Sequence, residues 1–455
     1  MRLTPRRRQQ LEIFALALAA HLIPMAIALV DPRRAYTAGD SESWFIHARN
    51  LVLYHVYSGE AAAPFLPGVF RTPAYPVFLA GVFGLTNFNL GAVLAVQAVL
   101  AALSAVFLFE LATRIGLSDA AARLGAIAIN VYPLAAIFWA TLASENLFVF
   151  FLVLTLLLTW DGANRSWLNA LATGGAAGLM TLTRPIGVLV LPALAIGVIW
   201  KCAPKQAALR LVSASLGLGL VLTPWLWRNA RVFGKPALAS VGGINLLTYN
   251  AAAVLTHRAG LGFWEGRYLV YDYWNHYYES LDPKPQNEVE DAYAMQSAAM
   301  VILMENPALS IWINSVESLN SLRPGFGQFT LFLQPNAFHQ SQSTGNDVSP
   351  ASGSFSRPLV LGVTIALTAF YGAAYLAFAL GAILMLLRRE WPAVFALLAP
   401  TAILLLSPGP VASSRFRVPA EPLMALVAAY AIREIVSRWR DWRAAPRSGR
   451  HPLPA

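Results

Sequence analysis

Hydrophobic residues lie in long, nearly uninterrupted runs along most of this 455-residue chain. About 20 apolar residues are enough for an α-helix to cross the hydrocarbon core of a bilayer. The pattern therefore predicts an all-α polytopic membrane protein with about ten transmembrane helices. The predicted helices cover residues 11–30, 91–113, 121–141, 145–160, 168–183, 185–200, 207–226, 358–387, 391–408 and 418–433.

Successive crossings place the loops between them on alternate sides of the membrane. One shorter apolar stretch, residues 73–85, does not fit this arrangement. It begins with Pro73 and Pro76, and counting it as a crossing would place the later Arg-rich loops on the outer side. We interpret it as an interfacial or re-entrant helix within a first outer loop, residues 31–90. A surface helix is expected in the same loop at residues 41–55.

A second outer segment, residues 227–357, is much longer and of mixed polarity. It is expected to contain helices at residues 288–304 and 307–322 and a linker-like Ser, Gly and Pro-rich stretch at 341–356. Its aromatic residues between Phe263 and Tyr278 could stack against a sugar, pack in a core or form an interfacial belt. The predicted organisation is a membrane catalytic module (1–226), an outer insert (227–357), C-terminal transmembrane helices (358–433) and a basic cytoplasmic tail (434–455).

Composition supports the membrane interpretation. Apolar residues make up 57% of the chain and charged residues 12%, against roughly 45–50% and 25% in soluble domains. A single water-soluble core, a disordered chain and a disulfide scaffold are therefore excluded. The only cysteine, Cys202, excludes an intramolecular disulfide and any multi-cysteine metal site.

The net charge of +10 is explained by membrane orientation rather than by binding to nucleic acid. With a cytoplasmic amino terminus, the predicted cytoplasmic segments carry +11 and the outer segments −1, as the positive-inside rule requires. We therefore expect no nucleic-acid partner. This orientation places residues 31–90 and 227–357 on the outer side of the membrane.

Two carboxylates at the predicted outer surface are candidates for catalysis. Asp40 follows the first helix, and it could instead serve as the N-cap of the next helix. Glu145 lies at an outer turn between two apolar helices, where an ionisable residue usually has a function, although helix capping is again an alternative. A positioned carboxylate can accept the proton of an attacking hydroxyl.

Several arginines lie at the same depth and could bind or stabilise a lipid phosphate. Arg71 could hold such a phosphate by bidentate hydrogen bonds or simply extend to the headgroups. The candidate substrate-binding residues are Glu42, Arg71, Tyr75, Arg184, Arg228, Arg415 and Arg417. No cofactor is firmly predicted. The seven His residues show no metal-type pairing, although Asp40, Glu42 and Glu145 could gather a divalent cation.

The ordered set of these motifs resembles the C-type membrane glycosyltransferases, which use polyprenyl-phosphate sugars. It is most similar to the bacterial relatives of protein O-mannosyltransferases and of lipid A aminoarabinose transferase. The motifs are Gly39-Asp40, Ala48-Arg49-Asn50-Leu51, Arg71-Thr72-Pro73-x-Tyr75-Pro76, Ser144-Glu145-Asn146-Leu147, Thr183-Arg184-Pro185, Pro224-Trp225 with Arg228-Asn229, Gly242-Gly243-x-Asn245-Leu246, Tyr249-Asn250 and Arg415-Phe416-Arg417-Val418-Pro419.

The resemblance implies an inverting transfer of a sugar from a polyprenyl-phosphate donor to a lipid, glycan or protein acceptor on the periplasmic face. It implies that Asp40 is the catalytic carboxylate and that Arg71 contacts the donor phosphate. Glu145 corresponds to the acid of the second loop, where relatives often carry Asp. In the family a soluble outer part usually follows the last helix. Here a basic cytoplasmic tail is expected in that place, so we expect residues 227–357 to recognise the acceptor instead.

Two other functions remain open at this point. A transporter or flippase of a lipid-linked glycan would need polar residues through the bilayer midplane, whereas the predicted helix centres are almost wholly apolar. A binding or scaffold protein of the envelope would need no activated donor. In each case membrane lipids surround the chain.

Overall fold

The computed structural model describes residues 4–37, 39–161, 166–333 and 357–444, and within these ranges the regular elements are helical. This confirms the all-α prediction. Each apolar run predicted from the sequence is helical. The corresponding elements are α1 (Pro5–Val30), α4 (Leu90–Arg114), α5 (Asp119–Ala128) with α6 (Pro133–Trp139), α7 (Ser144–Thr159), α8 (Trp167–Thr183), α9 (Gly187–Ile199), α10 (Pro204–Phe233), α18 (Arg357–Leu387), α19 (Trp391–Ala393) continued by α20 (Ala399–Leu406), and α21 (Glu421–Ala444). The predicted linker at 341–356 and the end of the basic tail, 445–455, lie outside the described residues.

Four helices are long and apolar enough to cross a membrane unaided: α1, α4, α10 and residues Val360–Leu387 of α18. Two bent pairs satisfy the same criteria when their halves are taken together. One is Asp119–Val131 with Pro133–Trp139, bent by 65°, and the other is Glu288–Glu305 with Pro307–Leu322, bent by 106°. The fold is therefore that of a polytopic membrane protein, while the figure of ten crossings stays a prediction.

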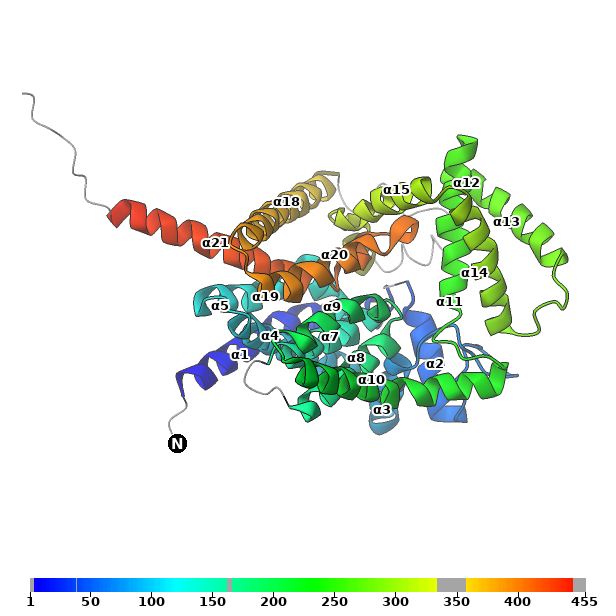
Figure 1. The fold of residues 1–455 in the computed structure, drawn as a ribbon, viewed down its shortest axis with the longest axis horizontal. Coiled ribbons are helices and arrows are strands. Elements are labelled where there is room, and N and C mark those ends of the chain that lie inside the picture. The colour runs from blue at the N-terminus through cyan, green and yellow to red at the C-terminus, as the bar shows by residue number, and fades with distance from the viewer. Residues whose placement is uncertain (1–3, 38, 162–165, 334–356, 445–455) are drawn as a thin grey trace, which may run out of the picture.

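The amino-terminal helices and the carboxy-terminal helices pack around a shared hydrophobic core (Figure 1). The core draws on α1, α4, α5, α7, α8, α9, α18 and α21. Helices α8 and α10 approach each other most closely at glycines. A Cβ on Gly217 would lie 2.0 Å from the carbonyl oxygen of Leu171, and one on Gly174 would lie 1.9 Å from that of Ala214. Small residues allow such close packing of membrane helices.

The two ends of the helical bundle differ in composition. Figure 1 shows the start of α1 and the end of α21 at one end and helices α11–α14 at the other. Ion pairs at the first end join segments that the sequence assigns to the cytoplasm. These pairs are Arg6–Glu110, Arg123–Glu12, Arg114–Asp161 and Arg388–Glu434. The predicted cytoplasmic segments thus gather at one end.

The opposite end carries the first outer loop and the insert. Helices α2 (Ser41–Tyr54) and α3 (Ala74–Thr86) pack against each other, in the places where the sequence predicts a surface helix and an interfacial helix. The insert contains α11 (Val241–Asn245), α12 (Ala252–Ala259), α13 (Phe263–Glu279), α14 (Glu288–Glu305) and α15 (Pro307–Ser318). Glu288 joins the two regions, because its carboxylate accepts hydrogen bonds from the backbone N–H of Val69, at 3.1 Å, and from the hydroxyl of Ser240.

The aromatic stretch of the insert lies on α13. Tyr273, Trp274 and Tyr277 pack against the hydrophobic core of the insert. Tyr268 and Tyr271 on the same helix are exposed. One face of the stretch therefore serves packing, and the other faces the surroundings.

Candidate functional site

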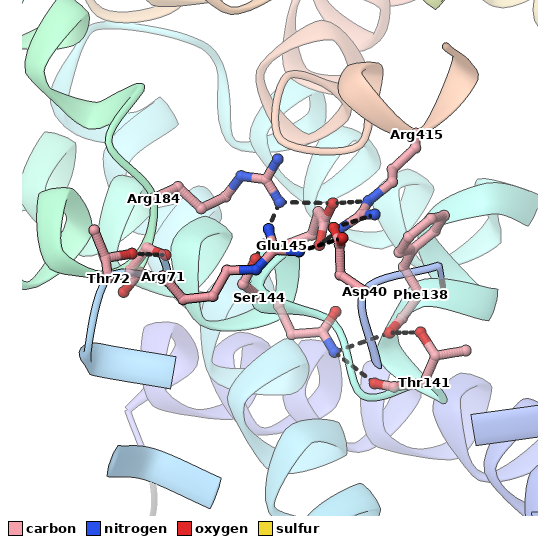
Figure 2. Close-up of polar contacts among 11 residues, drawn as sticks. Asp40, Arg71, Thr72, Phe138, Thr141, Ser144, Glu145, Arg184 and Arg415 are labelled. Atoms are coloured by element: carbon pink, nitrogen blue, oxygen red, sulfur yellow. Dashed lines mark hydrogen bonds and ion pairs between the residues drawn. The ribbon is translucent and has the colours of Figure 1, made fainter. Parts of the chain in front are cut away.

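Five of the predicted site residues meet in one cluster of charges: Asp40, Arg71, Glu145, Arg184 and Arg415 (Figure 2). They come from the residue preceding α2, the loop before α3, the first turn of α7, the end of α8 and the short 3₁₀ turn η8 (Ser414–Arg417). Each is brought in by a different element. We call this group the arginine–carboxylate cluster.

Asp40 binds one arginine with each carboxylate oxygen. Its Oδ1 lies 2.5 Å from Nη2 of Arg71, and its Oδ2 lies 2.7 Å from Nη1 of Arg415. Asp40 occupies the N-cap position of α2, but its side chain makes no capping hydrogen bond. The preceding Gly39 has a φ of +77°, a conformation that glycine adopts without strain. The carboxylate therefore pairs with the arginines and does not cap the helix.

Glu145 pairs with two arginines and is completely buried. Its Oε1 lies 2.7 Å from Nη1 of Arg184 and accepts a hydrogen bond from Nε of Arg415. Nη2 of Arg415 donates to Oε2 at 3.2 Å. The adjacent Ser144 accepts a further hydrogen bond from Arg184, at 3.0 Å. A buried charge is tolerated only when it is paired in this way.

Arg415 is the centre of the cluster, since it contacts both carboxylates. Three guanidinium groups face two carboxylates, so the cluster carries a formal charge of +1. The excess of arginine suits the cluster to bind an anion that can accept several hydrogen bonds, such as a phosphate.

The two carboxylates differ in accessibility. The side chain of Asp40 keeps 30% of its surface exposed, whereas that of Glu145 keeps none. Burial alone would raise the pKa of Asp40, but the positive charges of Arg415 and Arg71 lower this pKa to about 2. Asp40 is therefore an ionised carboxylate that an incoming group can reach. Glu145 is suited to holding the arginines in place.

The loop that carries Arg71 is fixed by hydrogen bonds to its neighbours. The hydroxyl of Tyr57 donates to the backbone carbonyl of Arg71 at 2.9 Å. The hydroxyl of Thr72 donates to the carbonyl of Thr183, the last residue of α8, at 3.0 Å. The guanidinium of Arg71 lies 4.8 Å from the ring centroid of Trp44, a cation–π contact. Arg71 is thus held next to the helix end that carries the third arginine.

Two other predicted residues of the first outer loop lie outside the cluster. Glu42 is exposed on α2. Tyr75 is fully buried, and its hydroxyl donates to the side-chain carbonyl of Gln97 at 2.8 Å. The structure thus brings neither side chain to the charged group, and their predicted role in substrate binding stays untested.

The remaining two predicted arginines also point elsewhere. Arg228, near the end of α10, donates to the backbone carbonyl of Gly68 at 2.9 Å and lies 5.1 Å from the ring centroid of Trp225. Arg417 is fully buried and pairs with Glu421 at 2.8 Å. Both side chains anchor segments next to the cluster rather than join it.

The carboxylates named for a divalent cation are not gathered around a common space. Arg415 lies between Asp40 and Glu145, and Glu42 is not part of the cluster. Within the described ranges, no group of three or more His, Cys, Asp or Glu residues could hold a metal ion.

Three residues that contact this region were not among the predicted site residues. Ser144 binds Arg184, the ring of Phe138 lies 5.8 Å from the guanidinium carbon of Arg415, and Glu421 pairs with Arg417. The spacing of four residues between Arg417 and Glu421 is a signal that could have found that pair. The other two contacts depend on tertiary structure.

Comparison with known protein families supports the resemblance seen in the sequence. Residues 70–227 match the family described as dolichyl-phosphate-mannose-protein mannosyltransferase, which confirms the resemblance for that part of the chain. No curated protein matches the chain in sequence.

Three solved structures are similar to the chain over most of its length. One is the archaeal oligosaccharyltransferase AglB from Archaeoglobus fulgidus in complex with an inhibitory peptide and a dolichol-phosphate, with 13% identity, a TM-score of 0.48 and 96% of this chain covered. The apo form of the oligosaccharyltransferase of that organism has 14% identity and a TM-score of 0.48, and the match covers 96% of this chain. ArnT from Cupriavidus metallidurans bound to undecaprenyl phosphate gives 12% identity, a TM-score of 0.39 and 95% coverage. The match spans 52% and 53% of the two archaeal chains and 81% of the ArnT chain.

Proposed function

We propose that this protein is a glycosyltransferase that moves a sugar from a polyprenyl-phosphate donor to an acceptor on the outer face of the membrane. The observation that carries the proposal is the accessible carboxylate of Asp40, held between two arginines in a cluster with an excess positive charge. The family match supports the choice of donor, since it includes three of the cluster residues, Arg71, Glu145 and Arg184.

In the proposed reaction an acceptor hydroxyl attacks the anomeric carbon of the donor sugar. Asp40 accepts the hydroxyl proton as the new glycosidic bond forms. The bond between the anomeric carbon and the phosphate oxygen breaks, and the polyprenyl phosphate leaves with the electron pair. Attack opposite the leaving group inverts the anomeric configuration. Arg71 and Arg415 stabilise the charge that develops on the phosphate.

Donor binding would also activate Asp40. In the structure both oxygens of Asp40 are occupied by arginines, and the pKa of about 2 makes the carboxylate a weak base. A donor phosphate competes for the same guanidinium groups, because it accepts bidentate hydrogen bonds from arginine. Once Arg71 and Arg415 turn toward the phosphate, the pKa of Asp40 rises and a carboxylate oxygen is released for the acceptor hydroxyl.

The proposed location is the bacterial inner membrane, with the cluster on the periplasmic side. The positive charge of the segments at the opposite end of the bundle supports this orientation. Acceptor recognition is proposed for the insert, because the contact from Glu288 to Val69 joins it to the loop that carries Arg71.

The test of this function is the transfer rate of the Asp40→Asn protein, purified and reconstituted into nanodiscs with polyprenyl-phosphate sugars and an envelope extract as acceptor. The expected loss is about 10²- to 10⁴-fold, the usual contribution of a general base. Release of polyprenyl phosphate is the readout. The Glu60→Gln protein is the matched control, because it neutralises an exposed acid of the same outer loop, and it should retain activity. Transfer by Asp40→Asn at the wild-type rate would contradict the assignment.

A further inference from the structure

A second ion pair is buried close to the arginine–carboxylate cluster, because Arg417 shares the turn η8 with Arg415. Nε of Arg417 lies 2.8 Å from Oε1 of Glu421, and neither side chain has any exposed surface. Nη1 of Arg417 also donates to the backbone carbonyls of Ser321, at 2.8 Å, and Arg323, at 2.7 Å. The guanidinium therefore ties η8 to the segment that follows α15.

Two tyrosines of α18 complete the surroundings of this pair. The guanidinium carbon of Arg417 lies 3.9 Å from the ring centroid of Tyr371, and Nη1 donates to the hydroxyl of Tyr375 at 2.7 Å. The hydroxyl of Tyr371 donates to Glu421 at 3.2 Å. Arg417 thus connects η8, α18, α21 and the turn η4 (Leu319–Leu322) at a single point.

Stability alone is a poor explanation for this pair. Replacing a buried ion pair with well-packed apolar residues is often neutral or stabilising, because two charges must be desolvated. Among the described residues, Nη2 of Arg417 and Oε2 of Glu421 have no hydrogen-bond partner, which adds to that cost. A planar, multiply bonded guanidinium is better suited to fixing the position of the backbone that carries it.

The backbone in question also carries Arg415. Both arginines belong to the four-residue turn η8, and residues two apart in a 3₁₀ turn project in different directions. Arg415 reaches Asp40 and Glu145, while Arg417 reaches into the core. A shift of this short turn would therefore move the backbone of both residues together.

We propose that Arg417 is a positioning residue, and that its buried pairing with Glu421 holds η8 so that Arg415 contacts Asp40 and Glu145 at the same time. The proposal rests on the proposed function only in taking Arg415 to bind the donor phosphate. It assigns Arg417, expected from the sequence to bind substrate, a role that acts through Arg415.

The test is a double-mutant cycle on the binding of undecaprenyl phosphate to the full-length protein in nanodiscs. Arg417→Lys keeps the charge but cannot reproduce the planar set of hydrogen bonds. It should weaken binding by roughly 10- to 100-fold, the range found when the supporting partners of metal-ligating residues are removed. In an Arg415→Ala background the same substitution should have no further effect. Equal effects in both backgrounds would overturn the proposal.

Two controls separate positioning from general stability. Arg388→Lys alters a partly exposed arginine–carboxylate pair that joins the same region of the fold, because Arg388, which follows α18, bonds Glu434 and the hydroxyl of Tyr430 on α21. If Arg388→Lys lost as much donor affinity as Arg417→Lys, the positioning role of Arg417 would be contradicted. Tyr375→Phe removes one hydrogen bond to Arg417, and it should give a smaller loss than Arg417→Lys in a protein that folds.

A measurement made in the absence of donor separates the positioning role of Arg417 from the proposed binding of the donor phosphate by Arg415. The cations facing Asp40 are Arg415, Arg71 and Arg184. If Arg417→Lys displaces Arg415, the acid transition of Asp40, followed by NMR of the labelled side chain, should move to higher pH. A moved transition with unchanged donor binding would support positioning and remove the phosphate-binding role of Arg415. An unmoved transition would overturn the positioning role.

Discussion

At the scale of single residues, two carboxylates share one arginine but differ in their exposure. Asp40 and Glu145 both bind Arg415, yet only Asp40 keeps exposed surface. The sequence identified both, because charged residues are conspicuous among apolar helices. It could not identify their partners, since Glu145 and Arg415 are 270 positions apart and meet only in the folded chain.

Substitution of Glu145 should affect folding more than substitution of Asp40. In the Glu145→Gln protein the amide cannot neutralise Arg184 and Arg415, so buried positive charge is left uncompensated. We expect a loss of about 3–5 kcal/mol in the free energy of unfolding, typical of breaking a buried pair. Thermal unfolding in detergent is the measurement. Glu305→Gln, which breaks an exposed pair with Arg258, should change the unfolding temperature little.

The ion pairs of Asp40 predict a specific dependence of stability on pH. The pKa of Asp40 is lowered from its ordinary 3.8 to about 2 in the folded protein, because two arginines outweigh the effect of burial. Its stabilising contribution is therefore fully present above about pH 4 and is lost as the pH falls through about 2. The difference in unfolding temperature between wild type and Asp40→Asn should be constant from pH 7 to pH 5 and shrink below pH 4. A difference that already declines between pH 7 and pH 5 would contradict this assignment.

At the scale of elements, the hydropathy pattern located the helices but not their breaks. The run at 121–141 was expected to be one helix, whereas it bends by 65° between Asp119–Val131 and Pro133–Trp139. Pro133 cannot donate a backbone hydrogen bond, which explains the break. The turn η8 also shows that two arginines in one motif can point in different directions, one to the cluster and one to the core. Hydrophobic periodicity predicts neither the position of a helix break nor the direction in which a charged side chain points.

The contact between α8 and α10 predicts a sharp difference between neighbouring glycines. Gly217→Ala places a methyl group against the carbonyl of Leu171 and must push the helices apart, at a cost of about 1–3 kcal/mol. Gly219→Ala meets nothing within 4 Å and should be neutral or slightly stabilising. Thermal unfolding of the two purified proteins is the comparison. Equal unfolding temperatures would argue against the close approach of the two helices.

At the scale of the whole molecule, charge separates the two ends of the bundle. The predicted cytoplasmic segments pair with one another, as in Arg6–Glu110 and Arg388–Glu434, and the arginine–carboxylate cluster lies among the predicted outer segments. The sequence could predict this separation because the positive-inside rule depends on simple counting. It could not predict that Glu288 joins the insert to the first outer loop, because that contact depends on the packing of distant segments.

The orientation is open to direct measurement because the chain has one native cysteine. In a Cys202→Ala background, Tyr268→Cys on α13 and Arg440→Cys on α21 are both exposed positions. A thiol reagent that cannot cross membranes should label residue 268 in spheroplasts, and it should label residue 440 only after permeabilisation. The reverse pattern would invert the proposed topology.

The paired state of Asp40 also has a consequence for the end of the proposed catalytic cycle. In the proposed reaction the spent polyprenyl phosphate would remain bound to Arg71 and Arg415, which pair with Asp40 in the structure. When Asp40 paired with these arginines again, it would displace the spent carrier. The same carboxylate would thus serve as a built-in competitor that clears the site, so its loss would slow carrier recycling as well as the transfer step.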